Sequence, residues 1–202
     1  MVPTGECQVF DIPVIYIQDV VAWIYQCSKC ATEEFSTLSP ISKYCVGLTC
    51  YAQNPLSEHA VLGADITAIS FEDEDQHLIL KEKLLIALER VLVDMTNKVG
   101  MEINYMVMDS YYQHLLPLVC GLGPRKANTL VRKIATLGGI LVNHDQFIKS
   151  GLLTTKIFLN AAGFLHTPQD SDMKSVNDQH MDEDGPDPLD ATCIQPEDYK
   201  LA

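Results

Sequence analysis

The chain has 202 residues, 47% of them apolar, and a formal net charge of -13. This composition is typical of a folded protein with one fair core or two small ones. The sequence contains neither an apolar run long enough to span a membrane nor the pattern of a signal peptide, so we expect a soluble intracellular protein.

The charge is distributed in three blocks. Residues 1–110 carry 16 acids and 6 bases, residues 111–163 carry 1 acid and 6 bases, and residues 164–202 carry 10 acids and 2 bases. The middle block is therefore a basic segment, net +5, between two acidic ones. A local basic segment of this kind favours a nucleic-acid partner, although the charge of the whole chain conceals it.

The first predicted elements are a strand and a helix. Residues Val9–Ile17 are rich in β-branched and aromatic side chains and predict one short strand, in which Pro13 indicates an edge or a bulge. This strand would pair with strands outside this chain or remain a stray extended segment. Asp19 predicts the start of a helix over residues 20–35, whose apolar face places Trp23 in the core.

Three further helices are predicted before residue 110. Ser39-Pro40 and Asn54-Pro55 bound a helix over residues 41–53, and residues 56–63 add a turn or two. Residues 72–99 have the clearest helical period in the chain, with acids at the positive end of the dipole and Gly100 as the stop. A short helix over Ile103–Met108 follows.

The remaining elements surround a glycine-rich turn. Asp109 predicts the start of a helix that runs to Val119, and a second helix follows the turn and ends at Gly138-Gly139. Asn143 and Thr154 or Thr155 predict two more helix starts. Residues 168–188 predict a solvated linker, and residues 199–202 the beginning of another helix.

The cysteines raise the question of a zinc site. Cys27, Cys30, Cys45 and Cys50 superficially resemble a four-thiolate set. The second pair lies five residues apart, about 140° around a helix, and no glycine knuckle flanks either pair. Buried free thiols are the favoured interpretation. The acids of residues 72–75 are interpreted as a solvated helix entrance, so we expect no metal and no cofactor.

The turn Gly121-Leu122-Gly123 lies in the basic segment. It is not a nucleotide loop, because the residues after it do not follow the spacing of a P-loop and a lysine stands where a dinucleotide fingerprint needs its third glycine. The pattern instead predicts two helices joined by a tight hairpin, with Leu122 plugging the gap between them. Gly123 would cap the second helix and Pro124 would take its first position.

A hairpin of this geometry exposes the first amides of the second helix, which is an environment that binds phosphate. Arg125 and Lys126 would contact the same oxygens, and Arg132 and Lys133 would extend the basic surface. Amides and point charges read the nucleic-acid backbone, not its base sequence. The alternative is a hairpin that only packs against its neighbours while its basic side chains are solvated.

The run from Leu116 to Ala127, LPLVCGLGPRKA, resembles the helix-hairpin-helix signature of the eukaryotic suppressor-of-Ty transcription elongation factors, which are histone chaperones related to bacterial Tex. Other segments are similar to that family in the same order: PVIYIQD, KYCVGLTCYAQNPLSE, LLIALERVLVDMTNKVGMEIN, KIFLNAAGFL and LDATCIQPEDYKLA. Together they cover most of residues 9–165 and again about 189–201.

The resemblance implies a mainly α fold: a tandem helix-hairpin-helix domain preceded by a partial RNase-H-like (α/β) segment and followed by an acidic disordered tail. The expected domains are residues 1–71, the C-terminal part of a YqgF/RNase-H-like domain, residues 72–166, the helix-hairpin-helix domain, and residues 167–202, an acidic linker and the start of a following domain. It also implies a nuclear protein that acts with RNA polymerase II and nucleosomes. The phosphate-contact role carries over to Gly121, Gly123, Arg125 and Lys126.

Departures from the family pattern limit what is expected. The second hairpin reads GLLTTK over residues 151–156 without a Gly-x-Gly, so Lys156 is the one candidate for phosphate contact there. The N-terminal strands of the RNase-H-like domain are missing, and with them the carboxylates of two-metal nuclease chemistry.

Three classes of function remain for comparison. The first is a non-enzymatic, sequence-nonspecific DNA-binding segment of an elongation factor. The second is a protein-protein scaffold module, or a truncated paralogue, that binds no nucleic acid. An enzyme is the least favoured, because the histidines show neither metal-ligand spacing nor a paired nucleophile.

Overall fold

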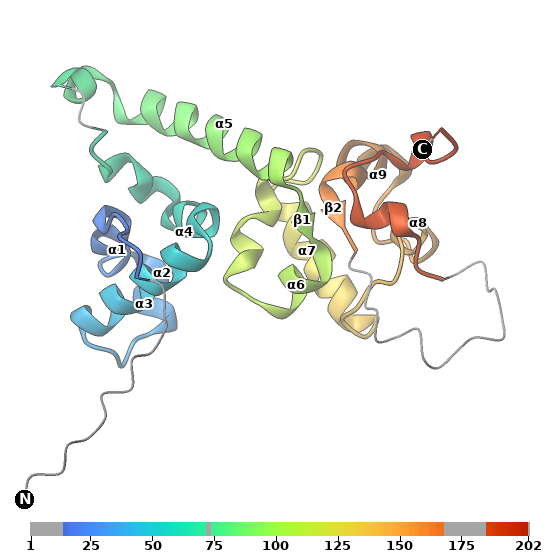
Figure 1. Cartoon of the computed structure of the whole chain (residues 1–202), viewed down its shortest axis with the longest axis horizontal. Coiled ribbons are helices and arrows are strands. Elements are labelled where there is room, and N and C mark those ends of the chain that lie inside the picture. The colour runs from blue at the N-terminus through green and yellow to red at the C-terminus, as the bar shows by residue number, and fades with distance from the viewer. Residues whose placement is uncertain (1–13, 72–73, 168–184, 202) are drawn as a thin grey trace, which may run out of the picture.

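Helix α5 (Lys81–Val99) connects two groups of helices and runs along one side of both (Figure 1). The computed structural model describes residues 14–71, 74–167 and 185–201. The helix ends at Gly100, whose φ of 73° favours glycine, as predicted. α5 contacts both α4 (Pro55–Leu62) of the first group and the second group of helices, and α4 also contacts the second group directly.

The start of α5 differs from the prediction, which placed it in the acidic run at Glu72. Residues Glu74–Leu78 form a 3-10 helix, and α5 begins only at Lys81. The Gln76 side chain explains the difference, because it accepts a hydrogen bond from the Phe71 amide (2.9 Å) and donates one to the Ile69 carbonyl (2.7 Å). These bonds close the chain into a turn ahead of the helix. The acids of residues 74–75 therefore lie outside α5, and residues 72–73 lie outside the described ranges.

The N-terminal group consists of α1 (Val20–Tyr25), α2 (Lys29–Glu34), α3 (Pro40–Gln53), α4 (Pro55–Leu62) and a 3-10 helix (Gly63–Ala68). Within residues 14–71 no strand is present. α1 packs mainly against α3. The buried apolar side chains of this group are Val21, Ala22, Tyr25, Ala31, Val61, Leu62, Ile66 and Ile69.

The bounds of α3 confirm the prediction that Ser39-Pro40 opens this helix and Asn54-Pro55 closes it, and Asn54 also caps α4, which was predicted only as a turn or two. Ser39 accepts a hydrogen bond from the Ser42 amide (3.2 Å), and Asn54 accepts one from the Ser57 amide (3.1 Å). A proline takes the first position of each helix, where its missing N–H is not needed. These capping residues act within three positions along the chain, so the sequence alone determines them.

The predicted helix over residues 20–35 is interrupted, and Trp23 does not lie in the core. Ser28 caps a separate helix, α2, by accepting from the Ala31 amide (3.1 Å). The Trp23 side chain is 58% exposed, because α1 turns Val21, Ala22 and Tyr25 inward. Its indole N–H donates to Asp19 (2.9 Å), which therefore holds the tryptophan at the surface and does not cap α1.

The predicted strand over Val9–Ile17 is not present in its described part. Residues 14–17 have no regular structure and are exposed, and residues 9–13 lie outside the described ranges. The described residues offer no neighbouring strand to which residues 14–17 could pair. Residues 14–17 therefore fit the alternative prediction of a stray extended segment that pairs with no strand.

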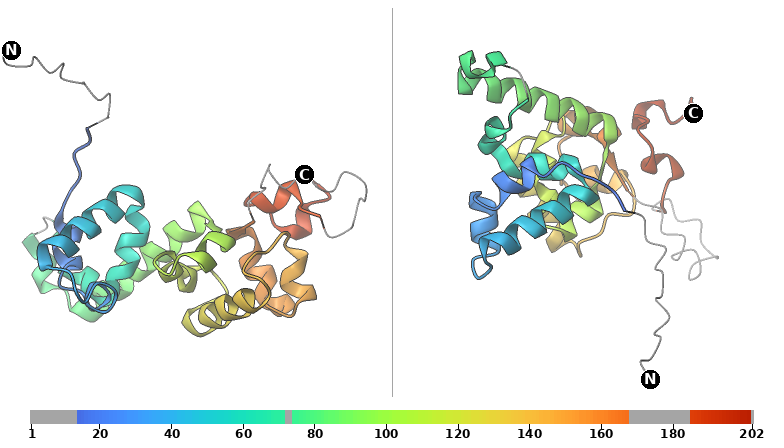
Figure 2. Two further views of the ribbon diagram at one scale, coloured as in Figure 1. Left: turned by 90° about the horizontal axis from the view of Figure 1, so that it is seen from below. Right: turned by 60° about the vertical axis from the view of Figure 1, so that its left-hand side comes forward.

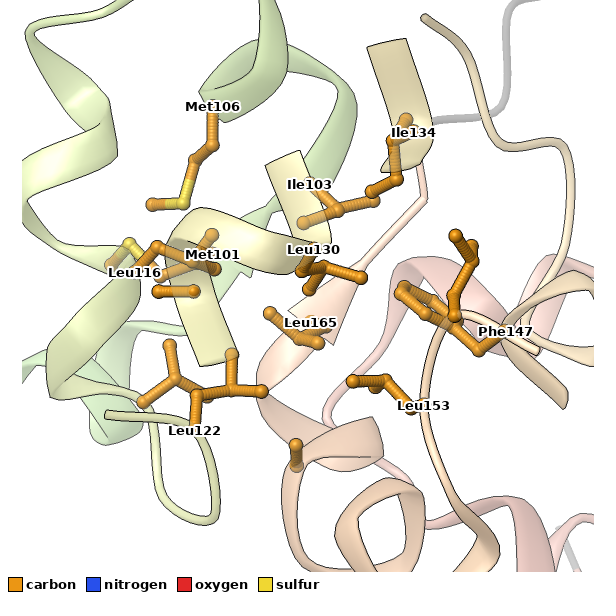
Figure 3. Close-up of a cluster of buried hydrophobic side chains, with 14 of the residues drawn as sticks. Met101, Ile103, Met106, Leu116, Leu122, Leu130, Ile134, Phe147, Leu153 and Leu165 are labelled. Atoms are coloured by element: carbon orange, nitrogen blue, oxygen red, sulfur yellow. The ribbon is translucent and has the colours of Figure 1, made fainter. Parts of the chain in front are cut away.

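The second group of helices surrounds one apolar core (Figure 3). It comprises α6 (Ile103–Met108), α7 (Pro124–Thr136), α8 (Asp145–Lys149), α9 (Thr155–Ala161) and a 3-10 helix (Ala162–Phe164). Two short parallel strands, β1 (Met101–Glu102) and β2 (Leu165–His166), join the start of α6 to the end of α9. This ladder closes the group around side chains such as Ile103, Leu130 and Phe147.

The helix predicted from Asp109 to Val119 is replaced by two 3-10 helices, Tyr112–His114 and Leu116–Leu118. The Asp109 side chain accepts a hydrogen bond from the Tyr111 amide (2.9 Å), which closes a turn and does not extend α6. Pro117 then lies within the second 3-10 helix. Leu115, Leu116 and Val119 are nevertheless buried, as the helical pattern predicted.

The described C-terminal residues, 185–201, are joined to the start of α8, where the Asp190 side chain accepts a hydrogen bond from the His144 amide (2.7 Å). Figures 1 and 2 show this segment in red, at the end of the molecule formed by the second group of helices. They form the 3-10 helices Pro188–Ala191 and Pro196–Asp198, and residues 199–201 form a turn where the sequence predicted the beginning of a helix. Most of the predicted linker, residues 168–184, lies outside the described ranges.

Candidate nucleic-acid interface

The first hairpin turn has the backbone that its two glycines predict. Gly121 and Gly123 have φ values of 88° and 85°, in the left-handed region that other residues rarely adopt. Leu122 between them is buried in the hairpin core, as expected of a plug (Figure 3). The two glycines serve different purposes: a Cβ at Gly121 would lie 3.0 Å from the Cβ of Asn160 on α9, whereas a Cβ at Gly123 would meet nothing within 4 Å.

The N-terminus of α7 is open to solvent. Gly123 takes the N-cap position without a side-chain cap, and Pro124 takes the first position. The first amides of a helix have no partner within the helix, so those of Arg125 and Lys126 are available to an anion. No acid lies in the first turn of α7. The open helix start was predicted from the sequence, and the phosphate contact there stays a prediction.

Asn97 of α5 holds the hairpin turn in place. Its side-chain oxygen accepts a hydrogen bond from the Cys120 amide (2.9 Å), and its side-chain nitrogen donates to the carbonyls of Leu118 (3.1 Å) and Val93 (2.6 Å). The sequence analysis did not identify this residue. The only signal was an amide side chain near the end of a long helix.

Two of the predicted phosphate ligands also hold the hairpins together. The Lys126 ammonium donates to the Gly121 carbonyl (2.9 Å), which closes the first turn. The Lys133 ammonium donates to the Gly151 carbonyl (2.7 Å) in the second turn. An ammonium has three donors, so each lysine keeps two for another acceptor. Both side chains are exposed and remain available to an anion.

Arg125 and Arg132 lie on one outward face of α7. They are seven residues apart, which places them two helical turns along the same stripe. Both are exposed, and among the described residues neither pairs with an acid. The two arginines are therefore more available to a phosphate than Lys126 and Lys133, which already donate to backbone carbonyls.

The second hairpin, residues 150–154, joins α8 to α9 and differs from the first. Gly151 alone has a positive φ, 61°, and the amides of Leu152 and Leu153 both donate to the Phe147 carbonyl. Lys156 is exposed near the start of α9, one turn before Asn160 on the same face. Because Asn160 packs against Gly121, the fold brings Lys156 towards the first hairpin turn.

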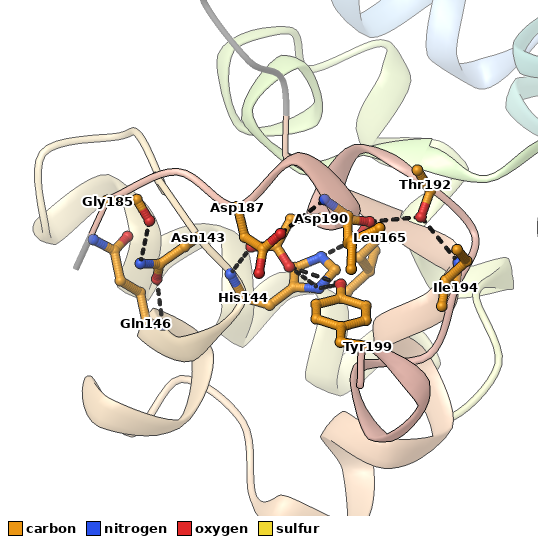
Figure 4. Close-up of polar contacts among 11 residues, drawn as sticks. Asn143, His144, Gln146, Leu165, Gly185, Asp187, Asp190, Thr192, Ile194 and Tyr199 are labelled. Atoms are coloured by element: carbon orange, nitrogen blue, oxygen red, sulfur yellow. Dashed lines mark hydrogen bonds and ion pairs between the residues drawn. The ribbon is translucent and has the colours of Figure 1, made fainter. Parts of the chain in front are cut away.

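A buried polar cluster fastens residues 185–201 to α8 (Figure 4). Asp190 accepts hydrogen bonds from the His144 amide (2.7 Å) and the Tyr199 hydroxyl (2.7 Å), and it lies 3.0 Å from the His144 Nδ1. The His144 Nε2 donates to the Leu165 carbonyl (2.6 Å). Burial raises the pKa of Asp190, but these hydrogen bonds outweigh it and leave the pKa below its usual value.

The cysteines of the predicted zinc alternative do not assemble into a site in the structure. Among the described residues no group of three His, Cys, Asp or Glu side chains is placed to hold a metal ion. The four thiols are free, but none of them is fully buried: Cys27 and Cys45 are exposed, and Cys30 and Cys50 are half-buried. The prediction of buried thiols was therefore wrong.

Two protein families match the chain. Residues 64–168 match the helix-hairpin-helix motif family, and residues 4–63 match the family described as Holliday-junction resolvase-like of SPT6, or YqgF. The first match alone covers more than half of the chain, and it contains α5, both hairpins and β2.

The chain is similar to transcription elongation factors named SPT6. It is 43% identical over 189 residues to the SPT6 of Mycosarcoma maydis, covering 93% of this chain and 11% of that protein. It is 41% identical over 191 residues to spt6 of Schizosaccharomyces pombe and 36% identical over 192 residues to SPT6 of Saccharomyces cerevisiae, each match covering 95% of this chain and 13% of the relative. The chain therefore belongs to the family of SPT6 transcription elongation factors, and it corresponds to their YqgF-like and helix-hairpin-helix segments.

Proposed function

We propose that the chain binds the phosphate backbone of duplex DNA through the first hairpin turn and helix α7. The observation that carries this proposal is the N-terminus of α7, which presents uncapped amides beside Gly123 where no side chain blocks access. Arg125 lies at this end of the helix, and Arg132 continues the same face. A bound phosphate would complete the hydrogen bonds of the free amides.

Electrostatics support DNA as the ligand in spite of the acidic chain. Residues 111–163 carry one acid, Asp145, and it pairs with Lys149 (3.6 Å). The outward face of α7 carries no acid at all. Because the donors are backbone amides and side-chain cations, they would contact phosphates without reading bases. We therefore propose binding without sequence specificity.

We place this activity in a non-enzymatic segment of a nuclear elongation factor that acts with RNA polymerase II and nucleosomes. The support is the similarity to relatives named transcription elongation factors, of whose length the chain spans roughly an eighth. No described helix is long and apolar enough to cross a membrane.

A salt titration of duplex binding tests the proposal. Each phosphate that a cation neutralises adds about 0.9 to the slope of log affinity against log salt. The double variant Arg125→Gln, Arg132→Gln should therefore bind more weakly at ~50 mM salt and reduce the slope by about 1.8. Random-sequence and defined duplexes should give the same result.

Arg90→Gln is the matched control, because Arg90 is an exposed arginine of α5 outside the basic segment. It should leave both affinity and slope unchanged. An equal loss in the control and the double variant, or no loss in either, would reject α7 as the DNA contact.

A second candidate function is the binding of a protein partner on α5. Val91, Met95 and Val99 lie one turn apart on this helix, and all three are exposed. An apolar stripe of this kind is typical of a helix face that another protein covers. Val91→Glu with Met95→Glu should abolish such binding and leave duplex affinity unchanged.

A further inference from the structure

A cavity of about 160 Å³ lies between the two groups of helices, and none of the residues predicted to contact phosphate lines it. Its wall combines four phenol rings with two carboxylates, and no lysine, arginine or histidine lines it. The residues that matter for its chemistry are Tyr25, Tyr105, Tyr111, Tyr112, Glu34 and Asp109. The wall of the cavity is therefore aromatic and negatively charged.

Two hydroxyls of this wall have no partner. Among the described residues, neither the Tyr25 nor the Tyr111 hydroxyl is hydrogen-bonded, although both oxygens are buried. Tyr25 is buried completely, on the inner face of α1. Leaving a buried hydroxyl without a partner is costly, so two such groups at one cavity indicate that a polar ligand completes them.

Three of the tyrosine rings form an aromatic cluster at the cavity wall. Tyr105 and Tyr112 pack edge to face with their centroids 4.5 Å apart, and Tyr111 lies edge-on to Tyr112 at 6.2 Å. Phenol ring faces attract cations, and Arg stacks on them with its plane. Tyr105 is partly exposed, which leaves the cavity open to solvent on that side.

A third carboxyl lies behind the Tyr25 ring. A Cβ at Gly47 would lie 2.6 Å from Tyr25 Cδ1 and 3.3 Å from Glu58 Oε1, so both side chains crowd this glycine. The two Glu58 oxygens are buried and also lack a hydrogen-bond partner among the described residues. The site therefore combines acceptors at the cavity wall with a further acidic group behind it.

We propose that this cavity binds the guanidinium group of an arginine side chain from a basic segment of a protein partner. Guanidinium has five planar donors, which suit two carboxylates and two unpaired hydroxyls. The described residues provide no set of three metal ligands, and the negative wall repels phosphate, so neither a metal ion nor nucleic acid is the ligand that fits.

Titration of the full chain with a short capped peptide, acetyl-Gly-Arg-Gly-amide, tests the proposal by NMR of the tyrosine ring protons. The rings of Tyr25, Tyr111 and Tyr112 should shift and saturate. The same peptide with citrulline, which keeps the shape but removes the charge, should bind about tenfold more weakly. Equal binding of both peptides, or shifts confined to other residues, would overturn the proposal.

Glu34→Gln and Glu33→Gln form a matched pair for this titration. Both acids are exposed on α2, but Glu34 lines the cavity, whereas Glu33 pairs with Lys29 (3.6 Å) outside it. Glu34→Gln should weaken arginine binding about fivefold or more, and Glu33→Gln should leave it unchanged. Unchanged peptide affinity in both variants would contradict the proposal. Stronger displacement of the peptide by magnesium chloride than by sodium chloride at the same ionic strength would contradict it as well. Duplex affinity should be the same in both variants, so this site can fail independently of the DNA interface.

Discussion

Asn97 and Cys120 connect the long helix to the first hairpin turn: the Asn97 side-chain oxygen accepts the Cys120 amide at 2.9 Å. The same side chain donates to the Leu118 carbonyl on the other side of the turn. One amide group thus satisfies two backbone groups of a segment that must hold two glycines at positive φ. The proposed phosphate site therefore depends on α5, although α5 contributes none of its proposed ligands.

Asn97→Ala should destabilise the protein by about 1–3 kcal/mol, because it leaves the Cys120 amide and the Leu118 carbonyl without their partner. Urea unfolding followed by circular dichroism measures this change. The control is Asn128→Ala on the exposed face of α7, which should change stability by less than about 0.5 kcal/mol. A similar loss in both variants would mean that the Asn97 contacts contribute nothing specific.

The two hairpin glycines should differ in their tolerance of alanine. At Gly123 the new methyl group meets nothing within 4 Å, so only the backbone conformation, φ 85° and ψ 165°, is penalised, by about 1–3 kcal/mol. At Gly121 the methyl group also meets Asn160 at 3.0 Å, so the loss should be larger. Thermal unfolding of both variants, side by side, gives the comparison. Equal destabilisation would show that α9 moves away from the turn at no cost when the methyl group is added at Gly121.

The sequence predicted the features that depend on near neighbours and missed those that depend on distant ones. The glycines, Pro124 and the buried face of α7 follow from turn and helix rules within a few residues. Asn97, in contrast, acts on residue 120, and His144 acts on Asp190, 46 residues away. Trp23 was misplaced for the same reason, because α1 packs against α3 through a face that the helical period alone could not identify.

Glu58 should make the protein less stable as the pH rises. Burial, and secondarily the nearby Glu34, raise the pKa of Glu58 from 4.5 to about 8. The folded state therefore binds more protons than the unfolded state between these two values. The free energy of unfolding falls over that interval by at most about 5 kcal/mol, at about 1.4 kcal/mol for each unit of pKa shift.

Glu58→Gln removes this titration, so its unfolding free energy should lack this fall between pH 5 and pH 8 and should exceed that of the wild type at the upper end. Chemical unfolding at several pH values measures both curves. Glu89→Gln on the exposed side of α5 is the control and should follow the wild type. A wild-type curve that is flat across this range would show that Glu58 is ionised or hydrated in the folded protein.

Asp190 should give the opposite pH dependence at the other end of the molecule. Its hydrogen bonds from His144 and Tyr199 hold its pKa below the ordinary 3.8. The folded state therefore keeps the carboxylate ionised where the unfolded state protonates it. The resulting stability is fully present above about pH 5 and is lost as the pH falls through the lowered pKa.

Asp190→Asn should lower the free energy of unfolding at pH 7 by about 2–4 kcal/mol and flatten its acid dependence, because an amide no longer accepts two charge-assisted bonds in a buried site. Asp198→Asn, in the same C-terminal segment, is the matched control and should behave as the wild type. Hydrogen exchange adds a local measurement: in Asp190→Asn the amide of His144, which donates to this carboxylate, should lose protection before the core of α7 does. Simultaneous loss at both places would mean that residues 185–201 and the hairpin core unfold as one unit, and that Asp190 does not fasten a separable segment.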